Sequence, residues 1–377
     1  MDYQNADLVR IAKRENNKKR GYLVINRLQG KHIPVKPDQA LAMFRALAGK
    51  VQGHCAGERT LVIGFAETAT AIGAAVAAQL GAYYIQTTRE DIAGAEYFCF
   101  SEVHSHATQQ RLVKGDLDRI MPKIDHVIFA EDEITTGNTI LNLVNILQKE
   151  YPKQAAYAAA SVLNGMDKQA LELYESRNIG IYYLVKTEHQ NYPQAVLQYS
   201  RKGIYRNMTA ESTTGNASEG LDQDPVIKEA AAGGWMDARR LVSARAYEKA
   251  CMGLWSEIDR CMHKKLTGRI LVLGTEEFMY PALVAADRIA QNGAQVWFHA
   301  TTRSPIEVYE EKEYPLHVRY ELPSLYDKFR RTFVYDLGAY DAVLIITDAH
   351  NTEREGLDAL LQAAAVNNSR IYVVRWC

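Results

Sequence analysis

Long apolar runs, clustered cysteines and an excess of charge of one sign are all scarce in this sequence of 377 residues. Lysine and arginine total 44 against 45 for aspartate and glutamate, a formal net charge of -1, so no global positive field argues for a nucleic-acid partner. The five cysteines are odd in number and widely scattered, which fits a reducing compartment rather than a disulfide framework. We therefore expect a cytoplasmic protein with reduced cysteines.

A membrane segment is also missing. The N-terminus lacks the apolar core of a signal peptide. The one long uncharged stretch, Thr68–Ile85, consists mainly of Ala, Gly and Thr, which predicts a buried helix and strand rather than a membrane span. Hydrophobic residues make up 47% of the chain, enough for a real core, and the length indicates two domains or one large one.

Short apolar segments alternate with helical patterns along most of the chain. This alternation predicts βαβ units, and hence an α/β fold with mostly parallel sheets. The predicted strands are Arg59–Gly64, Tyr83–Thr87, His126–Ala130, Tyr157–Leu163 and Ile179–Val185, and the predicted helices are Thr68–Leu80, Gly137–Lys149 and Lys168–Ser176.

The pattern breaks once and then resumes. Residues 206–234 are rich in Ser, Thr, Gly and Asn and show no apolar period, so we predict a linker or long surface loop between domains at 1–205 and 235–377. Three segments recur in the same order on either side of this break. RTLVIGFAET at 59–68 is answered by RILVLGTEEF at 269–278, GAYYIQTTRE at 81–90 by GAQVWFHATTRSPIE at 293–307, and DHVIFAEDEITTGNT at 125–139 by DAVLIITDAHNTEREG at 341–356. A tandem duplication explains the order better than coincidence does.

The segment HVIFAEDEITTGNT at 126–139 carries the clearest chemistry. Glu131 and Asp132 follow a buried strand, at the edge of the sheet where ligands of open α/β folds bind. The turn Thr135–Thr139 leads into a helix whose amide groups and dipole favour an anion such as phosphate. Carboxylates beside a phosphate are explained if they accept hydrogen bonds from vicinal ribose hydroxyls. The motif therefore predicts a ribose 5-phosphate site; the alternative is an ordinary strand, turn and capped helix.

This motif resembles the 5-phosphoribosyl-1-pyrophosphate (PRPP) signature of type I phosphoribosyltransferases. Together with NKKRGYLVINRLQGKHIPV, GFAETATAIG and SEVHSHAT, it is similar to the phosphoribosyltransferases encoded in bacterial tellurite-resistance and stress-response operons, which carry a C-terminal TRSP domain. The tetrapeptide of that name stands here at Thr302–Pro305. The resemblance implies a type I phosphoribosyltransferase fold for the first domain, and the repeat predicts a degenerate relative of it for the second.

The resemblance also implies roles for individual residues. A pyrophosphate loop would be formed by Ala66, Glu67, Thr68 and Ala69, with Arg89 contacting the same group. Glu67 would reach Mg2+ through water or cap a helix; both remain open. Glu131 and Asp132 would hold the ribose hydroxyls and Mg2+, and the 5-phosphate would be held by Thr135, Thr136, Gly137, Asn138 and Thr139. Arg89 has an alternative as an ordinary surface arginine.

A lid over the substrate is expected in the region 91–115. Glu102, His104 and His106 alternate there, so in an extended segment they share one face and serve as acid/base groups or pyrophosphate contacts. A metal site at the two histidines and a solvated polar loop are the alternatives. The segment Arg10–Lys36 holds nine basic residues and one Glu. We expect it to form a basic hood over the active site rather than a nucleic-acid arm.

The implied reaction transfers the 5-phosphoribosyl group of PRPP to a nucleobase-like acceptor, with Mg2+ as cofactor and release of pyrophosphate. The second domain lacks the T-T-G-x-T loop, so a site at Thr302, Arg303, Ser304 and Asp348 would serve an acceptor or product, or else this domain only packs. The rival function is a PRPP-sensing regulator without transfer activity. A homodimer is expected by resemblance alone.

Overall fold

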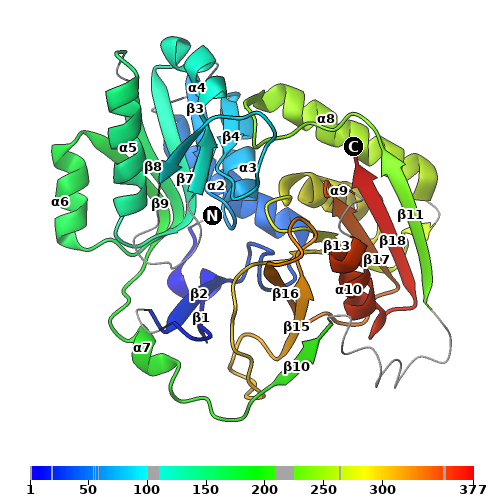
Figure 1. The fold of residues 1–377 in the computed structure, drawn as a ribbon. Helices are drawn as coiled ribbons and strands as arrows, with labels where there is room; N and C mark the ends of the chain where they lie inside the picture. Colours follow the sequence, from blue (N-terminus) through cyan, green and yellow to red (C-terminus); the bar gives the residue numbers. More distant parts are fainter. Residues whose placement is uncertain are drawn as a thin grey trace. The chain divides into compact units, whose positions relative to one another are not determined.

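The computed structural model describes residues 2–17, 20–53, 55, 57, 59–100, 110–153, 155–208, 225–262, 265–350 and 354–377. They form two compact units, each made of separate stretches of the chain (Figure 1). The first unit comprises Met1–Asn5, Leu41–His189 and Met236–Ala250, and the second comprises Ala6–Ala40, Gln190–Trp235 and Cys251–Cys377.

The first unit is built on a six-stranded sheet in the order β12-β4-β3-β7-β8-β9. Five of the strands are parallel, and β12 runs antiparallel to β4 at one edge. All five residues of β3 are buried, as expected of a parallel strand covered on both faces. The strands are β3 (Thr60–Gly64), β4 (Tyr83–Gln86), β7 (His126–Ile134), β8 (Ala156–Asn164), β9 (Ile179–Lys186) and β12 (Val242–Ser243).

Helices and one hairpin complete this unit. Helix α3, in which five of eleven residues are Ala and most others are apolar, is buried on almost every side. At its Gly73, an added Cβ would lie 2.8 Å from the Cα of Gly64 on β3, so only glycine permits this approach. The elements are α3 (Thr70–Leu80), α4 (Lys114–Ile120), η1 (Met121–Lys123), α5 (Asn138–Glu150) and α6 (Lys168–Ser176), with β5 (Tyr97–Phe100) antiparallel to β6 (Gln110–Val113). Helix α2 (Pro37–Gln52) lies mostly in this unit.

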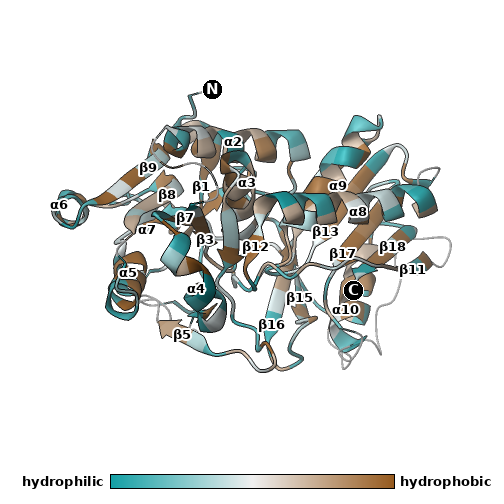
Figure 2. Cartoon of the chain, turned by 90° about the horizontal axis from the view of Figure 1, so that it is seen from above, coloured by the Kyte–Doolittle hydropathy of each residue, from teal (hydrophilic) through white to brown (hydrophobic). Residues whose placement is uncertain are grey.

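The second unit has a five-stranded, wholly parallel sheet in the order β11-β18-β17-β13-β14. Its strands β14-β13-β17-β18 follow one another as β4-β3-β7-β8 do in the first unit. In Figure 2, β13 and β17 are largely hydrophobic, whereas α6 of the first unit is largely hydrophilic. The strands are β11 (Val226–Ala232), β13 (Arg269–Gly274), β14 (Gln295–Ala300), β17 (Ala342–Thr347) and β18 (Arg370–Trp376), and the helices are α8 (Ala244–Met262, begun in the first unit), α9 (Tyr280–Gln291) and α10 (Arg354–Ala365).

Two smaller sheets accompany it. The three-stranded sheet β10-β15-β16 joins β10 (Ile204–Asn207) to the antiparallel pair β15 (Val318–Pro323) and β16 (Arg331–Tyr335), and β1 (Val9–Lys13) pairs antiparallel with β2 (Tyr22–Asn26). The short helices are α1 (Asn5–Leu8) and α7 (Tyr192–Ala195). Within the described residues, no helix combines the length and apolarity needed to cross a membrane.

The predicted α/β fold with mostly parallel sheets is confirmed. The expected strands of the first domain all form, and the helix predicted at Lys168–Ser176 has those bounds. The uncharged stretch Thr68–Ile85 is indeed a buried helix followed by a strand.

The predicted linker at 206–234 is wrong in part. Residues Val226–Ala232 form β11, an edge strand parallel to β18, and Ile204–Asn207 form β10. Residues 209–224 lie outside the described part of the chain. The strand β11 escaped prediction because most of its side chains are exposed, which removes the apolar period that marks a strand.

The compact units also differ from the consecutive boundaries 1–205 and 235–377, because they interleave. The segment Ala6–Ala40 belongs to the second unit. There the amide of Glu15 donates to the carbonyl of Pro305 at 3.0 Å, and Ala12 and Ile25 join a buried cluster with residues 306–335. The expected basic hood therefore packs within the second unit, and its place over the active site stays a prediction.

Asp116 of α4 binds the returning segment Met236–Ala250 to the first unit. Its side chain is 1% exposed. Arg240 donates two hydrogen bonds to its carboxylate, at 2.6 and 2.9 Å, and the amide of Leu241 donates a third at 3.1 Å. Burial alone would raise the pKa of Asp116, but these bonds hold it below its usual value.

We predict that Asp116→Ala destabilises the first unit by about 2–3 kcal/mol, because it leaves the donors of Arg240 and Leu241 without their acceptor. Asp118→Ala, which removes a 42% exposed carboxylate on the same helix, should cost under about 1 kcal/mol. Urea unfolding followed by far-UV circular dichroism measures both. All four tryptophans lie in the second unit, so their fluorescence reports that unit separately. Equal losses of unfolding free energy in the two variants would contradict the role that we assign to Asp116.

Candidate functional site

The predicted site residues of the first unit converge on one edge of its sheet. Strand β3 lies between β4 and β7, and Gly64 is in register with Gln86 on one side and Ala130 on the other. The segments that follow these three positions therefore leave the sheet next to one another. They contain the predicted pyrophosphate loop, Arg89 and the acidic pair, in the place where ligands of open α/β sheets bind.

The loop after β3 is held by buried hydrogen bonds. The amide of Ala66 donates to Thr87 Oγ1 at 2.8 Å. The hydroxyl of Thr87 donates to Gln110 Oε1 at 2.7 Å, and the side-chain amide of Gln110 donates to the carbonyl of Ala66. Both polar groups of Ala66 are thus satisfied before any ligand arrives. The peptide bond between Ala66 and Glu67 is cis.

The start of α3 lies directly after this loop. Ala69 precedes the helix, and no side-chain hydrogen bond caps it there. The buried hydroxyl of Tyr84 donates to the carbonyl of Thr70 at 2.7 Å and fixes the first turn. Glu67 is 7% exposed and Thr68 is partly exposed. An uncapped helix start with fixed amide groups is suited to an anion.

The acidic pair lies within β7, which continues beyond the predicted Ala130 to Ile134. Thr68 donates its hydroxyl to Asp132 Oδ1 at 2.8 Å, so the loop after β3 touches the end of β7 directly. Burial of the carboxyl group raises the pKa of Asp132 to about 6, and the nearby charge of Glu133 acts in the same direction. Burial also raises the pKa of Tyr174 on α6, helped by the charge of Glu131.

The turn after β7 depends on one glycine. Gly137 has φ +73° and precedes the first residue of α5. The buried hydroxyl of Tyr174 donates to its carbonyl at 2.7 Å, and a Cβ at this position would lie 2.5 Å from the same oxygen. Thr136 Oγ1 accepts a long hydrogen bond, 3.4 Å, from the amide of Asn138. Thr135 and Thr139 are partly exposed on either side.

Arg89 follows Thr88, whose backbone pairs with Arg111 of β6 through two hydrogen bonds of 2.9 and 3.0 Å. The β5-β6 hairpin, part of the expected lid region, is therefore fastened to the same edge of the sheet. Glu102, His104 and His106 lie outside the described residues, so their predicted roles stay predictions.

The candidate site of the second unit lies at the corresponding edge of its own sheet. Arg303 pairs with Glu276 at 2.6 Å and with Glu277 at 3.2 Å. Tyr326 donates to Asp348 at 2.6 Å. Thr302 Oγ1 accepts from the amide of Ser304 at 3.2 Å. Lys31, fully buried, donates to the carbonyls of Glu276 and Thr301 at 2.7 and 2.9 Å.

Several residues that shape these sites escaped prediction, namely Thr87, Gln110, Tyr174, Glu276 and Tyr326. The threonine pair before each arginine, TTR at 87–89 and again at 301–303, was a signal for Thr87. The others act through contacts distant in sequence, which no local pattern marks.

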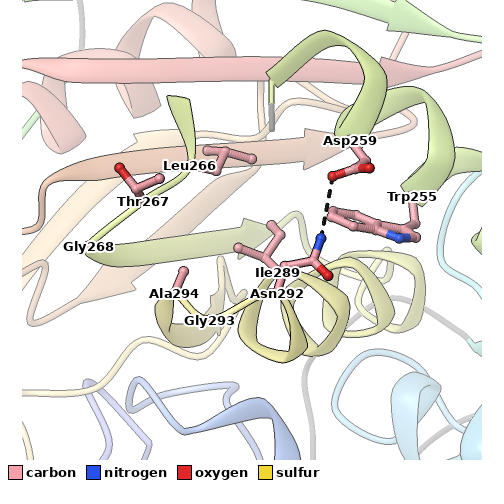
Figure 3. A pocket seen from close by; sticks show the side chains of 9 residues that line it. All are labelled: Trp255, Asp259, Leu266, Thr267, Gly268, Ile289, Asn292, Gly293 and Ala294. Carbon is pink, nitrogen blue, oxygen red and sulfur yellow. Dashed lines mark hydrogen bonds between the residues drawn. The ribbon is translucent and has the colours of Figure 1, made fainter. Parts of the chain in front are cut away.

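A small cavity of about 130 Å3 lies elsewhere in the second unit (Figure 3). Gly268 and Ala294, which directly precede β13 and β14, place it at the amino ends of these strands. Ligands of parallel sheets bind at the opposite edge, so we assign it no function. Its lining residues are Trp255, Asp259, Leu266, Thr267, Gly268, Ile289, Asn292, Gly293 and Ala294.

We predict that Gly137→Ala destabilises the protein by about 1–3 kcal/mol, because the new Cβ combines an unfavourable backbone conformation with a clash against Tyr174. Gly115→Ala is the matched control: it lies in α4 and its Cβ would meet nothing within 4 Å. Thermal unfolding followed by circular dichroism compares them. A Gly137→Ala variant as stable as the control would refute this account of the turn.

The raised pKa of Asp132 predicts a pH-dependent stability with a definite sign. Folded Asp132 holds its proton up to about pH 6, against an ordinary value of 3.8, so its contribution to stability falls as pH rises between these values. Asp132→Asn should therefore raise the free energy of unfolding at pH 8 by about 1–3 kcal/mol and have no such effect near pH 4.

Asp125, which directly precedes β7, is a control for which we expect the opposite change in stability. Its hydrogen bonds with Arg59 and Lys153 lower its pKa to about 2, so Asp125→Asn should lower stability at pH 8. Denaturant unfolding at both pH values measures the pair of variants. Destabilisation by Asp132→Asn at pH 8 would contradict the burial of its charge.

Comparison with known families agrees with this arrangement. A sequence-family model described as phosphoribosyl transferase matches residues 8–186, and one described as the TRSP domain C-terminal to that transferase matches residues 243–364. No curated protein sequence matches the chain.

Solved structures give weaker similarity. Adenine phosphoribosyltransferase from Trypanosoma brucei is 17% identical, with a TM-score of 0.30 over 40% of this chain and 65% of that enzyme. The enzyme of the same name from Rhodothermus marinus is 13% identical, with a TM-score of 0.33 over 48% and 96%. Orotate phosphoribosyltransferase from Mycobacterium tuberculosis is 16% identical, with a TM-score of 0.27 over 48% and 90%.

Structural matches at this level do not bear on substrate or mechanism. The two family matches cover most of the chain and follow one another in the expected order. The chain therefore belongs to the family of phosphoribosyltransferases that carry a TRSP domain on their C-terminal side.

Proposed function

We propose that the protein transfers the 5-phosphoribosyl group of PRPP to a nitrogen atom of a nucleobase-like acceptor and releases pyrophosphate. The observation that carries this proposal is the 2.8 Å hydrogen bond between Thr68 and Asp132. It brings a loop suited to an anion against a carboxylate suited to sugar hydroxyls, and PRPP carries both groups on adjacent carbons.

The 5-phosphate would bind at Thr135–Thr139. The left-handed backbone of Gly137 lets the chain turn from β7 into α5, whose first amide groups and dipole favour negative charge. The hydroxyls of Thr135, Thr136 and Thr139 would supply further donors, as would the amide of Asn138 if it exchanged its long bond to Thr136 for the phosphate. Tyr174 holds the turn from behind, through the carbonyl of Gly137.

The ribose hydroxyls would donate to Glu131 and Asp132. An ionised carboxylate accepts hydrogen bonds at both oxygens without donating any, and a pKa of about 6 leaves Asp132 charged at neutral pH. Hydrogen bonds from Thr68 and from backbone amides only partly offset the cost of burying its charge, so hydroxyl donors of a ribose would stabilise it further.

The donor set also fits Mg2+. This ion is usually held by one or two carboxylates together with substrate phosphates and water, rather than by a cage of protein ligands. Glu131 and Asp132 provide such carboxylates. Glu67 lies in the same loop as Thr68, which contacts Asp132. Within the described ranges no cluster of three His, Cys, Asp or Glu side chains could hold a metal by itself. Bound there with PRPP, the ion would neutralise pyrophosphate charge.

Pyrophosphate would leave against the loop after β3. The bond between C1 and the pyrophosphate oxygen breaks, its electron pair stays with pyrophosphate, and the acceptor nitrogen forms the new bond to C1. In this loop the amides of Ala66 and Ala69 already donate to Thr87 Oγ1 and to the carbonyl of Phe65, so the amides of Glu67 and Thr68, with the guanidinium of Arg89, would stabilise the negative charge that grows on the leaving group. The Thr87 and Gln110 bonds hold that loop in place beforehand.

The β5-β6 hairpin would carry the lid. Its attachment at Thr88 and Arg111 places the hairpin beside Arg89, and Glu102, His104 and His106 lie in the segment that joins its strands. We assign them to water exclusion and acid/base work on the acceptor, because a sugar cation reacts readily with water.

The wider setting rests on the resemblance in sequence. We place the protein in the bacterial cytoplasm, in a tellurite-resistance or stress pathway that makes a nucleoside-like product, and as a homodimer. The combination of phosphoribosyltransferase and TRSP segments supports this placement.

Transfer is tested by measuring pyrophosphate release from PRPP and Mg2+ across a panel of purine and pyrimidine bases with the full chain. Release dependent on one class of base is expected. Tight PRPP binding without turnover on any base would contradict the proposed transferase activity and favour a PRPP-sensing regulator.

We predict that Glu131→Gln combined with Asp132→Asn abolishes PRPP binding, at least about 100-fold in affinity, because amides are weaker acceptors and carry no charge for Mg2+. Glu133→Gln, next along the same strand and paired instead with His189 at 3.2 Å, should retain binding. Isothermal titration calorimetry measures both. Unchanged affinity in the double variant would refute the ribose assignment.

A further inference from the structure

The second unit repeats the first in its hydrogen bonds as well as in its strand order. In the first, the amide of Ala66 donates to Thr87 Oγ1 and the amide of Thr87 to the carbonyl of Gly64, at 2.8 and 2.9 Å. In the second, the amide of Glu276 donates to Thr301 Oγ1 and the amide of Thr301 to the carbonyl of Gly274, at 2.9 and 3.1 Å. The two loops therefore share one construction.

The neighbouring elements correspond too. Helix α3 begins six residues after Gly64, and α9 begins six residues after Gly274. Thr302 pairs with Phe333 of β16 as Thr88 pairs with Arg111 of β6. The hairpin β15-β16 of the second unit thus stands where β5-β6 stands in the first, and its turn, Ser324–Arg330, corresponds to the lid segment.

The register of the central strands identifies the counterpart of Asp132. Gly64 is paired with Ala130, two residues before Asp132. Leu273 is paired with Ile345, so Gly274 is level with Ile346, two residues before Asp348. Asp348 therefore occupies the position of Asp132.

The two loops differ at one decisive position. Where the first has the small Ala66, the second has Glu276, which is fully buried and has φ +47°. Its carboxylate pairs with Arg303 at 2.6 Å and with Arg330 at 3.2 Å, and it accepts from the hydroxyl of Ser324. Arg303 is the counterpart of Arg89, and the other two partners come from the turn of the hairpin.

That turn also covers the acidic position. Tyr326 donates its hydroxyl to Asp348 at 2.6 Å and lies 2.7 Å from the hydroxyl of Thr275. Asp348 is 6% exposed. Asp132 accepts a hydroxyl from Thr68 of the loop after β3, whereas Asp348 accepts one from the hairpin turn, on the side where Asp132 would meet a ribose hydroxyl.

We propose that the second unit is a copy of the first whose substrate site is filled by its own side chains, so that each chain binds one PRPP. The carboxylate of Glu276 takes the place of the pyrophosphate, and the hydroxyl of Tyr326 takes the place of a ribose hydroxyl. This replaces the expectation of a ligand site at Thr302, Arg303, Ser304 and Asp348. The identity of the displaced groups rests on the proposed function.

Removing Glu276 should restore an anion site. Arg303 and Arg330 would each lose the carboxylate of Glu276, so the local charge would become more positive by one unit and would favour an added anion. Glycine is the substitution of choice because the positive φ at this position suits it better than any other residue.

The test titrates Glu276→Gly with inorganic pyrophosphate and follows tryptophan fluorescence, which reports the second unit alone. The ring of Trp376 lies 6.0 Å from that of Phe278, in the loop itself. We expect pyrophosphate to raise the fluorescence-monitored melting temperature of the variant by about 3 °C or more beyond any shift of the wild type. The control Glu277→Gln keeps Glu276 in place and should behave as the wild type does.

Two outcomes would overturn the inference: a folded Glu276→Gly variant that does not respond to pyrophosphate, or a wild-type second unit that responds as strongly. The wild type supplies a second measurement should the variant fail to fold. Calorimetry with PRPP and Mg2+ should give one site per chain, removed by Glu131→Gln with Asp132→Asn, and two sites would contradict the proposal. If PRPP does not bind at all, the proposed function is contradicted. The inference about the second unit would still be decided by the pyrophosphate titration, which involves no PRPP.

Discussion

A single hydrogen bond, from a loop amide to the hydroxyl of the threonine that directly follows the neighbouring strand, recurs in both units and holds the same loop in each. It is made by Ala66 and Thr87 in one unit and by Glu276 and Thr301 in the other. In each unit the bond fixes a short loop at the carboxyl edge of a parallel sheet, directly before a helix. The backbone of the loop is thereby positioned independently of what it binds, and the side chains around it are free to differ.

The difference in side chains gives the two loops different partners. With Ala66, the first loop has no side chain beyond Cβ to occupy the anion position, and Thr68 reaches Asp132. With Glu276, the second loop carries its own negative charge, which two arginines and a serine surround. In our proposal the same scaffold carries a substrate site in the first unit and a filled site in the second, and Glu276, where the first unit has Ala66, supplies the carboxylate that fills it.

The filled site has a structural consequence for the second unit. Arg303, Arg330, Glu276 and Asp348 tie the strand ends to the β15-β16 hairpin, whose counterpart in the first unit, β5-β6, is the hairpin proposed to carry the lid. A hairpin that is bound through charged groups is more rigid than one that must open for substrate. We infer that duplication allowed one copy to exchange ligand binding for internal contacts.

The sequence predicts the parts of this account that depend on local pattern. The strands of the first unit, α6, the acidic pair and the turn at Gly137 all have apolar runs, strand ends or turn residues that mark them. The repeat in three segments predicts two related halves, and the strand orders agree with it. The strand β11 is exposed and so has no apolar period, and its assignment as a linker was wrong.

The remaining features depend on contacts between distant residues. Ala6–Ala40 joins the second unit through pairing with residues near 300, such as Val35 with Phe298, which no local signal reveals. The sequence shows a glutamate at position 276, but its positive φ and its two arginine partners depend on tertiary packing and could not be predicted. The role of Tyr326 likewise depends on a hairpin turn that returns to the end of β17.

The most direct test of the central claim is a crystal structure of the full chain with PRPP and Mg2+. The account predicts one PRPP per chain, with its 5-phosphate at Thr135–Thr139, its ribose hydroxyls at Glu131 and Asp132, and its pyrophosphate against Ala66–Ala69. It predicts that Glu276 keeps its contacts with Arg303 and Arg330 in the same crystal. PRPP bound at the second unit with Glu276 displaced, or phosphate groups away from both loops of the first unit, would contradict it.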